Sequence, residues 1–167
     1  RPEYADHWAA KWADLLRPNP YRVGIKAVMT YDAWIRDSFR KNKPYDQFVK
    51  EQIAGDLFPA KNDTQRNDML TATGFLAIGP KSLNTRNAEQ FRMDVADEQL
   101  DVATRGVMAL SVACARCHDH KFDPLTQRDY YGFFALFNQV PETGVPPGGG
   151  QYRIAEPFVR VGTAEDD

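Results

Sequence analysis

Apolar side chains recur along most of the chain at steps of three and four residues, the spacing typical of amphipathic helices. The first such run covers Glu3–Arg17 and contains Tyr4, Trp8 and Trp12. Pro18 follows it directly, and proline cannot continue a helix because it lacks a backbone N–H and clashes with the preceding turn. The pattern therefore predicts that the chain opens with a helix ending at Arg17.

The same spacing predicts five further helices. Thr64 is expected to cap the fourth helix of the chain. Thr126 is followed three residues later by Asp129, a pattern typical of the capped start of a helix, and the aromatic-rich segment Tyr130–Phe137 comes next. The predicted ranges are about Ala27–Arg40, Pro44–Leu57, Thr64–Ile78, Glu89–Ala115 and Thr126–Phe137. The fold class predicted for this part of the chain is all-α, an irregular multi-helix domain.

The composition changes after Val140. Pro141, Pro146 and the glycines at 148–150 are typical of a flexible linker, and Tyr152–Val161 has the pattern of a short extended segment. We expect a helical domain at residues 1–140 and a linker with an extended arm at residues 141–167. The arm is expected to dock on another domain or subunit.

The composition of the chain limits the kinds of partner that it is expected to bind. The chain has 167 residues, 43% of them hydrophobic, and a net charge of −2, so it has the makeup of a globular domain and gives no electrostatic reason to expect binding to nucleic acid or an anionic membrane. No apolar run approaches the roughly 20 residues needed to cross a bilayer, so no transmembrane segment is expected. Because the chain begins with Arg1, we expect a mature product or part of a longer protein.

The sequence Cys-Ala-Arg-Cys-His at 114–118 is the strongest chemical signal in the chain. Cys-x-x-Cys-His is the attachment signature of haem c. Two thiols at this spacing, Cys114 and Cys117, can form thioethers with the two vinyl groups of a porphyrin, and the adjacent His118 can then act as the proximal axial ligand of the iron. The chain has two cysteines in all, so no other thiol competes for this role.

Two other uses of the cysteine pair stay open at this stage. Zinc would need four ligands, and the further soft ligands are His118, His120 and the distant His7. A redox disulfide is the second alternative, although the surroundings lack the strand-to-helix pattern of thioredoxin-like sites.

The residues that would complete a haem site are less well defined. Arg116 and Lys121 are candidates to pair with the haem propionates through charge-assisted hydrogen bonds. The distal ligand is unknown. Its candidates are His7, Met93, Met108 and His120.

The motif and its surroundings point to a family. The run from Cys114 to Leu125, followed by Asp129 and two tyrosines, resembles the cytochrome-c-motif domain of unknown function found in large secreted planctomycete proteins. The resemblance extends over roughly Tyr4–Phe137, and its further matching stretches are Trp8–Leu16, Tyr31–Trp34, Pro44–Phe48, Ala54–Leu57 and Ala72–Leu76. It implies haem attachment at Cys114 and Cys117 and axial ligation by His118, and it identifies no sixth ligand.

Together these observations favour a periplasmic or extracellular c-type cytochrome domain that transfers single electrons. The expected partners are other redox proteins or haem subunits within a larger protein or assembly. Covalent haem attachment takes place outside the cytoplasm, which is the reason for the expected location. The alternatives are a haem enzyme of the peroxidase type with an open distal site, and a structural or interaction domain stabilised by zinc.

Overall fold

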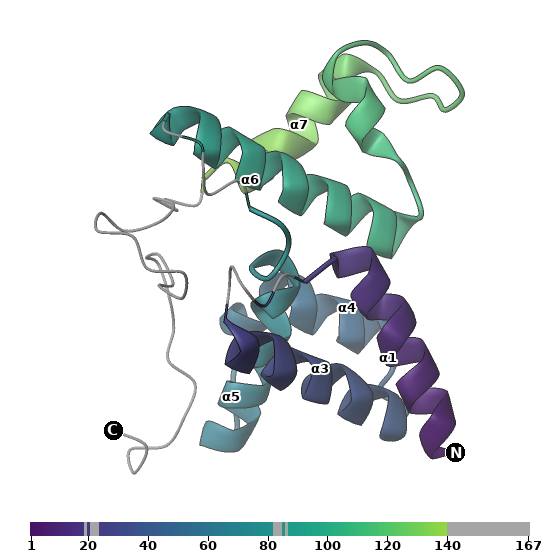
Figure 1. Ribbon diagram of the computed structural model, residues 1–167, viewed down its shortest axis with the longest axis vertical. Coiled ribbons are helices and arrows are strands. Elements are labelled where there is room, and N and C mark those ends of the chain that lie inside the picture. Colours follow the sequence, from purple (N-terminus) through teal and green to yellow (C-terminus); the bar gives the residue numbers. More distant parts are fainter. Residues whose placement is uncertain (19, 21–23, 82–84, 86, 140–167) are drawn as a thin grey trace. The chain divides into compact units, whose positions relative to one another are not determined.

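The computed structural model describes residues 1–18, 20, 24–81, 85 and 87–139. Within these ranges every regular element is helical, so the all-α prediction is confirmed (Figure 1). The α-helices are α1 (Pro2–Leu16), α3 (Ile25–Arg40), α4 (Tyr45–Ala54), α5 (Asp63–Ala72), α6 (Ala88–Ala103) and α7 (Gln127–Phe137). The predicted linker and arm at 141–167 lie outside the described residues.

Several details of the predicted helices were wrong. The helices predicted to reach Leu57 and Ile78 end at Ala54 and Ala72, where the 3-10 helices η1 (Gly55–Leu57) and η2 (Thr73–Leu76) follow. The helix predicted for Glu89–Ala115 ends at Ala103, and a π-helical turn, η3 (Thr104–Met108), follows it. Ala109 then adopts a left-handed conformation with φ of 56°, which ends the run of helical hydrogen bonds. The cap of α5 is Asn62 rather than Thr64, because the side chain of Asn62 accepts the backbone N–H of Gln65 at 2.9 Å.

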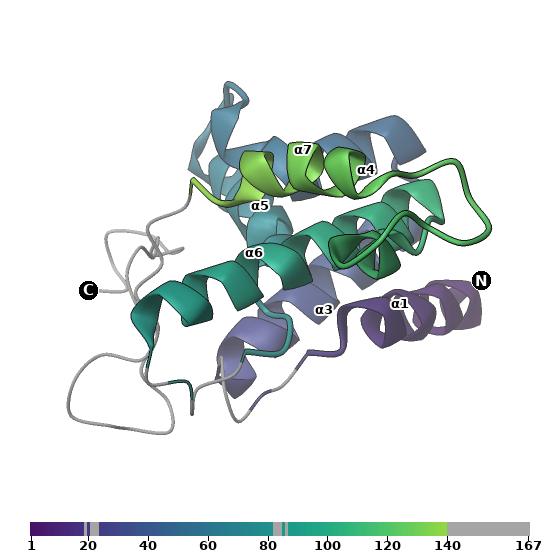
Figure 2. The same cartoon turned by 90° about the horizontal axis from the view of Figure 1, so that it is seen from above.

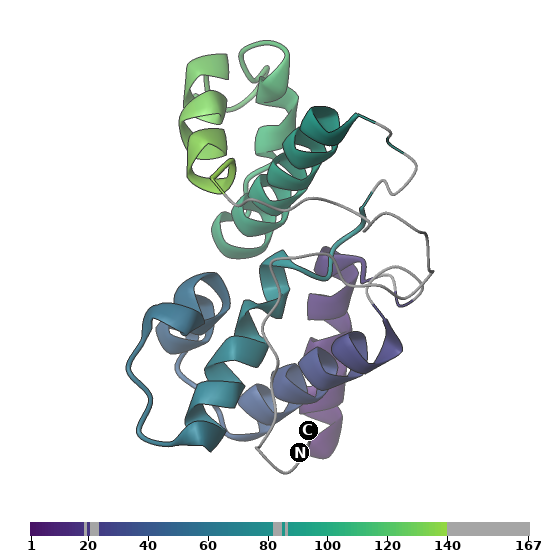
Figure 3. The same cartoon turned by 90° about the vertical axis from the view of Figure 1, so that its left-hand side faces the viewer.

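The chain divides into two compact units, one formed by Arg1–Gly79 and the other beginning at Pro80. The predicted helical domain of residues 1–140 spans both. In the first unit α1 lies alongside α3 (Figure 3). Its core is aromatic: Trp34 stacks on Tyr31 and on Phe48, with ring centroids 5.9 and 5.3 Å apart. Such stacked pairs add to the stability gained from burying the rings.

A buried glutamine forms hydrogen bonds with polar groups of two helices in the first unit. Gln52 is 1% exposed, and its side-chain oxygen accepts hydrogen bonds from Trp12 Nε1 at 2.9 Å and from the Tyr31 hydroxyl. Its side-chain nitrogen donates to the backbone oxygen of Phe48 at 3.0 Å. Burial raises the pKa of Tyr31 well above its ordinary value, so this hydroxyl stays protonated and acts as a donor. One side chain thus satisfies donors from α1 and α3.

In the second unit α6 and α7 lie side by side (Figure 2). A short 3-10 helix, η4 (Val112–Arg116), packs against both of them. The buried residues that join these three elements are Ala96, Leu100, Val112, Ala115, Tyr130 and Phe134. This core fixes the segment that carries the Cys-x-x-Cys-His motif.

The close approach of Gly55 to α5 provides a test of the fold. A Cβ atom at Gly55 would lie 2.3 Å from the backbone oxygen of Met69, and a backbone atom cannot move away as a side chain can. We expect Gly55→Ala to lower the free energy of unfolding by about 3 kcal/mol. Gly132→Ala is the matched control, because nothing lies within 4 Å of its added methyl group in α7.

The control substitution should raise the free energy of unfolding by about 0.5–1 kcal/mol, since alanine is the better helix former. Urea denaturation of both variants provides the measurement. Equal stability of the two variants would mean that the described packing of Gly55 on α5 is incorrect.

Candidate functional site

The 3-10 geometry of η4 separates the motif into an inner and an outer face. A 3-10 helix has three residues per turn, so residues three positions apart point in the same direction. Val112 and Ala115 form the inner pair and are both 0% exposed. Cys114 lies in η4 and Cys117 directly follows its last residue, and both are exposed free thiols. Both thiols are therefore accessible to a ligand from solvent.

Arg116 joins this turn to both neighbouring helices. Its Nη1 donates to Asp97 Oδ2 on α6 at 2.9 Å, and its backbone oxygen accepts from Gln127 Nε2 on α7 at 3.0 Å. The Tyr131 hydroxyl lies 3.3 Å from the same backbone oxygen and donates to it. The negative charge of Asp97 is the main reason that the pKa of Arg116 is raised further, so this side chain remains a cation.

The start of α7 is fixed by a capping box. The Thr126 side chain accepts the backbone N–H of Asp129 at 3.1 Å, and the Asp129 carboxylate accepts the backbone N–H of Thr126 at 2.9 Å. Asp119 adds a further tie, because its Oδ1 accepts the backbone N–H of Gln127 at 2.8 Å. The predicted pairing of Thr126 with Asp129 is confirmed, and the hydrogen bond from Gln127 to Asp119 links the start of α7 to the loop after the motif.

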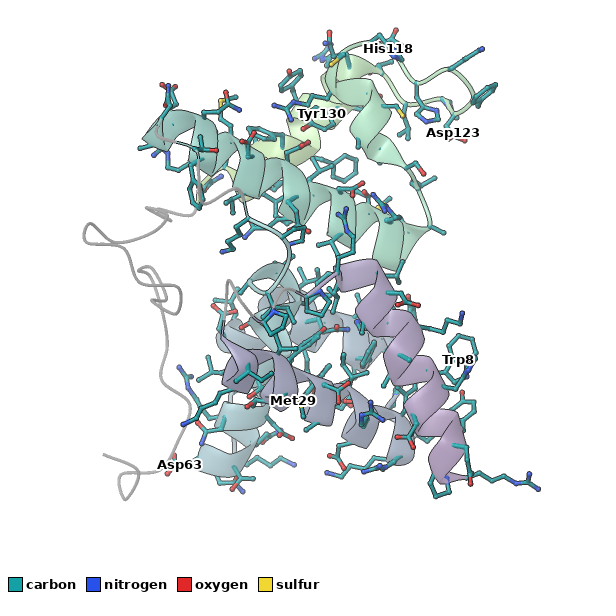
Figure 4. The ribbon with its side chains drawn as sticks, viewed as in Figure 1. Trp8, Met29, Asp63, His118, Asp123 and Tyr130 are labelled. Atoms are coloured by element: carbon teal, nitrogen blue, oxygen red, sulfur yellow. The ribbon has the colours of Figure 1, made fainter. Side chains whose placement is uncertain are left out.

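The hydrogen bond of His118 determines which of its ring nitrogens is available. His118 is exposed, and its Nδ1 lies 2.8 Å from the backbone oxygen of Asp119. A carbonyl oxygen can only accept, so Nδ1 must carry the proton. In the neutral ring the lone pair then resides on Nε2, which is the tautomer needed for metal ligation through Nε2. Figure 4 shows His118 at the outer end of the turn.

His120 differs, because three groups of its own loop contact its Nδ1. The backbone N–H groups of Phe122 and Asp123 lie 3.3 and 3.0 Å from this nitrogen, and Asp123 Oδ2 lies 3.2 Å from it. Nδ1 is therefore engaged within the loop. The backbone N–H of His120 also donates to the oxygen of Leu125 at 2.8 Å. His120 thus serves to close the loop that follows the motif.

The other distal-ligand candidates are spread over the chain. Met93 on α6 is partly buried and packs against the core of the second unit. Met108, at the end of η3, is 46% exposed. His7 belongs to the first unit, where its ring packs edge-on against Trp8 at 5.5 Å.

Two aromatic side chains in and after the motif's loop are exposed. Phe122 is 83% exposed, and Tyr131 is 47% exposed although its hydroxyl contacts the backbone of Arg116. Lys121 places its ammonium group 5.2 Å from the ring centroid of Phe122. Tyr131 thus lies against the residue that precedes Cys117.

Asp97 and Tyr130 are the site residues that sequence reasoning missed. The Tyr130 hydroxyl donates to Asp97 Oδ1, while Arg116 donates to Oδ2 of the same carboxylate. Tyr130 is buried between α6 and α7, and desolvation together with this hydrogen bond raises its pKa well above the ordinary value (Figure 4). One feature of the sequence could have indicated Asp97. It directly follows Ala96, a core residue of α6, so its carboxylate lies beside the core.

Within the described residues no group of three or more His, Cys, Asp or Glu side chains is arranged to hold a metal ion. No helix in the same part of the chain has the length and apolar character needed to cross a membrane.

The model of the PSCyt2 family, a protein of unknown function (DUF1549), matches residues 1–142. The chain therefore belongs to this family. No curated protein and no solved structure shows a significant match to it.

The capping box of α7 gives a pH-dependent contribution to stability. Hydrogen bonds from Thr126 lower the pKa of Asp129 below its usual range. A carboxyl group with a lowered folded-state pKa stabilises the protein above its unfolded pKa of about 4, and this stabilisation is lost as the pH falls through the folded-state value. We expect Thr126→Ala to lower the free energy of unfolding by about 1 kcal/mol at neutral pH and by less in acid.

Urea denaturation at neutral pH and near pH 3 measures the difference. Thr64→Ala is the matched control, because Thr64 lies in the first turn of a helix that Asn62 already caps. The control should not destabilise the protein at either pH. A loss for Thr126→Ala that is the same at both pH values would contradict the role given to Asp129.

Proposed function

We propose that this member of the PSCyt2 family is an extracytoplasmic c-type cytochrome domain that carries one covalent haem and transfers single electrons. The observation that carries the proposal is the exposure of two free thiols, Cys114 in η4 and Cys117 directly after it, next to a histidine with an available Nε2. The residues present fit the chemistry of this group.

The fit rests on the donor set. Thioether formation needs two free thiols, and the exposed Cys114 and Cys117 supply them at the spacing of the haem c signature. Axial ligation needs an imidazole with a lone pair on Nε2, and the hydrogen bond from Nδ1 of His118 to Asp119 favours that tautomer. A zinc site would instead need four ligands, and Nδ1 of His120 is engaged by groups of its own loop.

When bound, haem supplies the one-electron couple of its iron. The residues of this chain hold and orient the group. Cys114 and Cys117 would hold it covalently, and His118 would ligate its iron. The hydrogen bond from Nδ1 of His118 to the backbone oxygen of Asp119 would keep the ring in the tautomer that leaves Nε2 available.

Location and partners follow from the same proposal. Covalent attachment of haem to thiols takes place outside the cytoplasm, so the protein is assigned to the periplasm or the extracellular space. Its donors and acceptors are other redox proteins or haem subunits, within a larger protein or assembly.

Intact mass and a pyridine haemochrome spectrum test the proposal. The full chain, expressed with a haem-attachment system, should gain the mass of one haem and show the spectrum of two thioether links. Cys114→Ser and Cys117→Ser should each leave one thioether and move the haemochrome band to longer wavelength. An unmodified mass in the parent chain would rule out the cytochrome proposal.

The three histidines of the chain provide a matched series. His118→Gln should abolish the normal ferric spectrum, because it removes the proximal ligand. His7→Gln and His120→Gln should each leave that spectrum unchanged. If one of these two variants converted the low-spin spectrum of the parent chain to a high-spin spectrum, the replaced histidine would be the distal ligand. That result would contradict the expected unchanged spectrum.

A further inference from the structure

We propose that Arg116 is the positioning residue of the haem site, and that it acts by fastening the thiol-bearing turn to α6 and α7 rather than by pairing with a haem propionate. The inference rests on the proposed function. It is carried by the contacts at both ends of Arg116, which join η4 to two different helices.

The side-chain end of Arg116 is occupied by acidic groups of α6. Nη1 lies 2.9 Å from Asp97 Oδ2, and Nη2 lies 3.9 Å from Asp94 Oδ1. The second oxygen of Asp97 accepts the hydroxyl of Tyr130, whose ring is 1% exposed. The guanidinium therefore neutralises a carboxylate that is also tied to a core residue of α7.

The backbone end of Arg116 is held independently. Its carbonyl oxygen accepts one hydrogen bond from Gln127 Nε2 and one from the Tyr131 hydroxyl, at 3.0 and 3.3 Å. Both donors belong to α7. The next residue along the chain is Cys117, so these bonds limit the movement of the second thiol directly.

The contacts of Arg116 direct its side chain toward α6. Its guanidinium lies against Asp97 and Asp94 of that helix. A guanidinium that turned to a propionate on the thiol side would leave Asp97, which is only 25% exposed, without its cation. Loss of one partner from a partly buried charge pair is costly, so the geometry favours the fastening role.

Hydrogen–deuterium exchange of the full chain, prepared with and without haem attachment, tests this role. Charge-assisted hydrogen bonds are about twice as strong as neutral ones. We expect Arg116→Gln and Asp97→Asn each to speed exchange of the amides of Val112–His118 by about tenfold, the effect of losing one such bond. Arg116→Lys should restore part of the protection, since it keeps the charge but not the forked geometry.

Arg128→Gln is the matched control, because it removes an exposed arginine of α7 and makes the same change in net charge. Its exchange should equal that of the parent chain. If Arg116→Gln sped amide exchange equally over the whole second unit, the variant would have lost global stability. That result would overturn the positioning role.

The haem-bearing forms separate this proposal from the propionate alternative. Arg116→Gln and Asp97→Asn should both lower the fraction of protein with two thioethers, as read from mass and haemochrome spectrum. The reduction potential of correctly attached Arg116→Gln protein should match that of Asp97→Asn protein. A shift in potential confined to the Arg116 variant would assign Arg116 to a propionate instead.

The two proposals fail in different ways. A parent chain that never acquires haem overturns the proposed function, while the exchange measurement on the haem-free chain still tests the contacts of Arg116. Unchanged exchange at Val112–His118 in both variants overturns the positioning role even if the parent chain carries haem.

Discussion

The second unit depends on the hydrogen bonds that the carboxylate of Asp97 accepts. Its two oxygens accept hydrogen bonds from Tyr130 and Arg116, so a single side chain of α6 is tied to α7 and to η4. Tyr130 is itself part of the apolar core with Leu100 and Val112. A polar contact at the edge of the core and apolar burial within it therefore hold the same three elements. The presentation of the thiols follows from this arrangement, because η4 has no independent stability as a single short turn.

The boundaries of the helices illustrate what a sequence pattern can predict. Apolar periodicity located the six α-helices within the described residues, because each buries a stripe of side chains against its neighbours. It misplaced several helix ends, most clearly after Ala103, where apolar residues continue at helical spacing through Val107 and Val112 while the backbone changes from α to π and then to 3-10 geometry. A period of three and a period of 3.6 cannot be distinguished over five residues.

Some residues of the candidate site could also be predicted from the sequence, whereas others could not. The two cysteines and His118 were identified from their order in the chain, because covalent chemistry with one ligand requires that spacing. Asp97 lies far from them in sequence, and an acidic residue in a helix is ordinarily a solvated one. Its role appears only when α6 and η4 are packed together, which places its carboxylate against the guanidinium of Arg116.

His118 and His120 show how backbone contacts assign different tasks to identical side chains two residues apart. One ring donates from Nδ1 to a carbonyl and keeps its Nε2 lone pair, and the other has its Nδ1 engaged by two backbone N–H groups and the carboxylate of Asp123. These contacts favour His118 over His120 as the proposed ligand. Under the proposed function, covalent bonds would supply the affinity and no closed cavity would be needed. The chain would then have only to present two thiols and one imidazole, and the contacts of Asp97 and Arg116 would hold the segment that carries them.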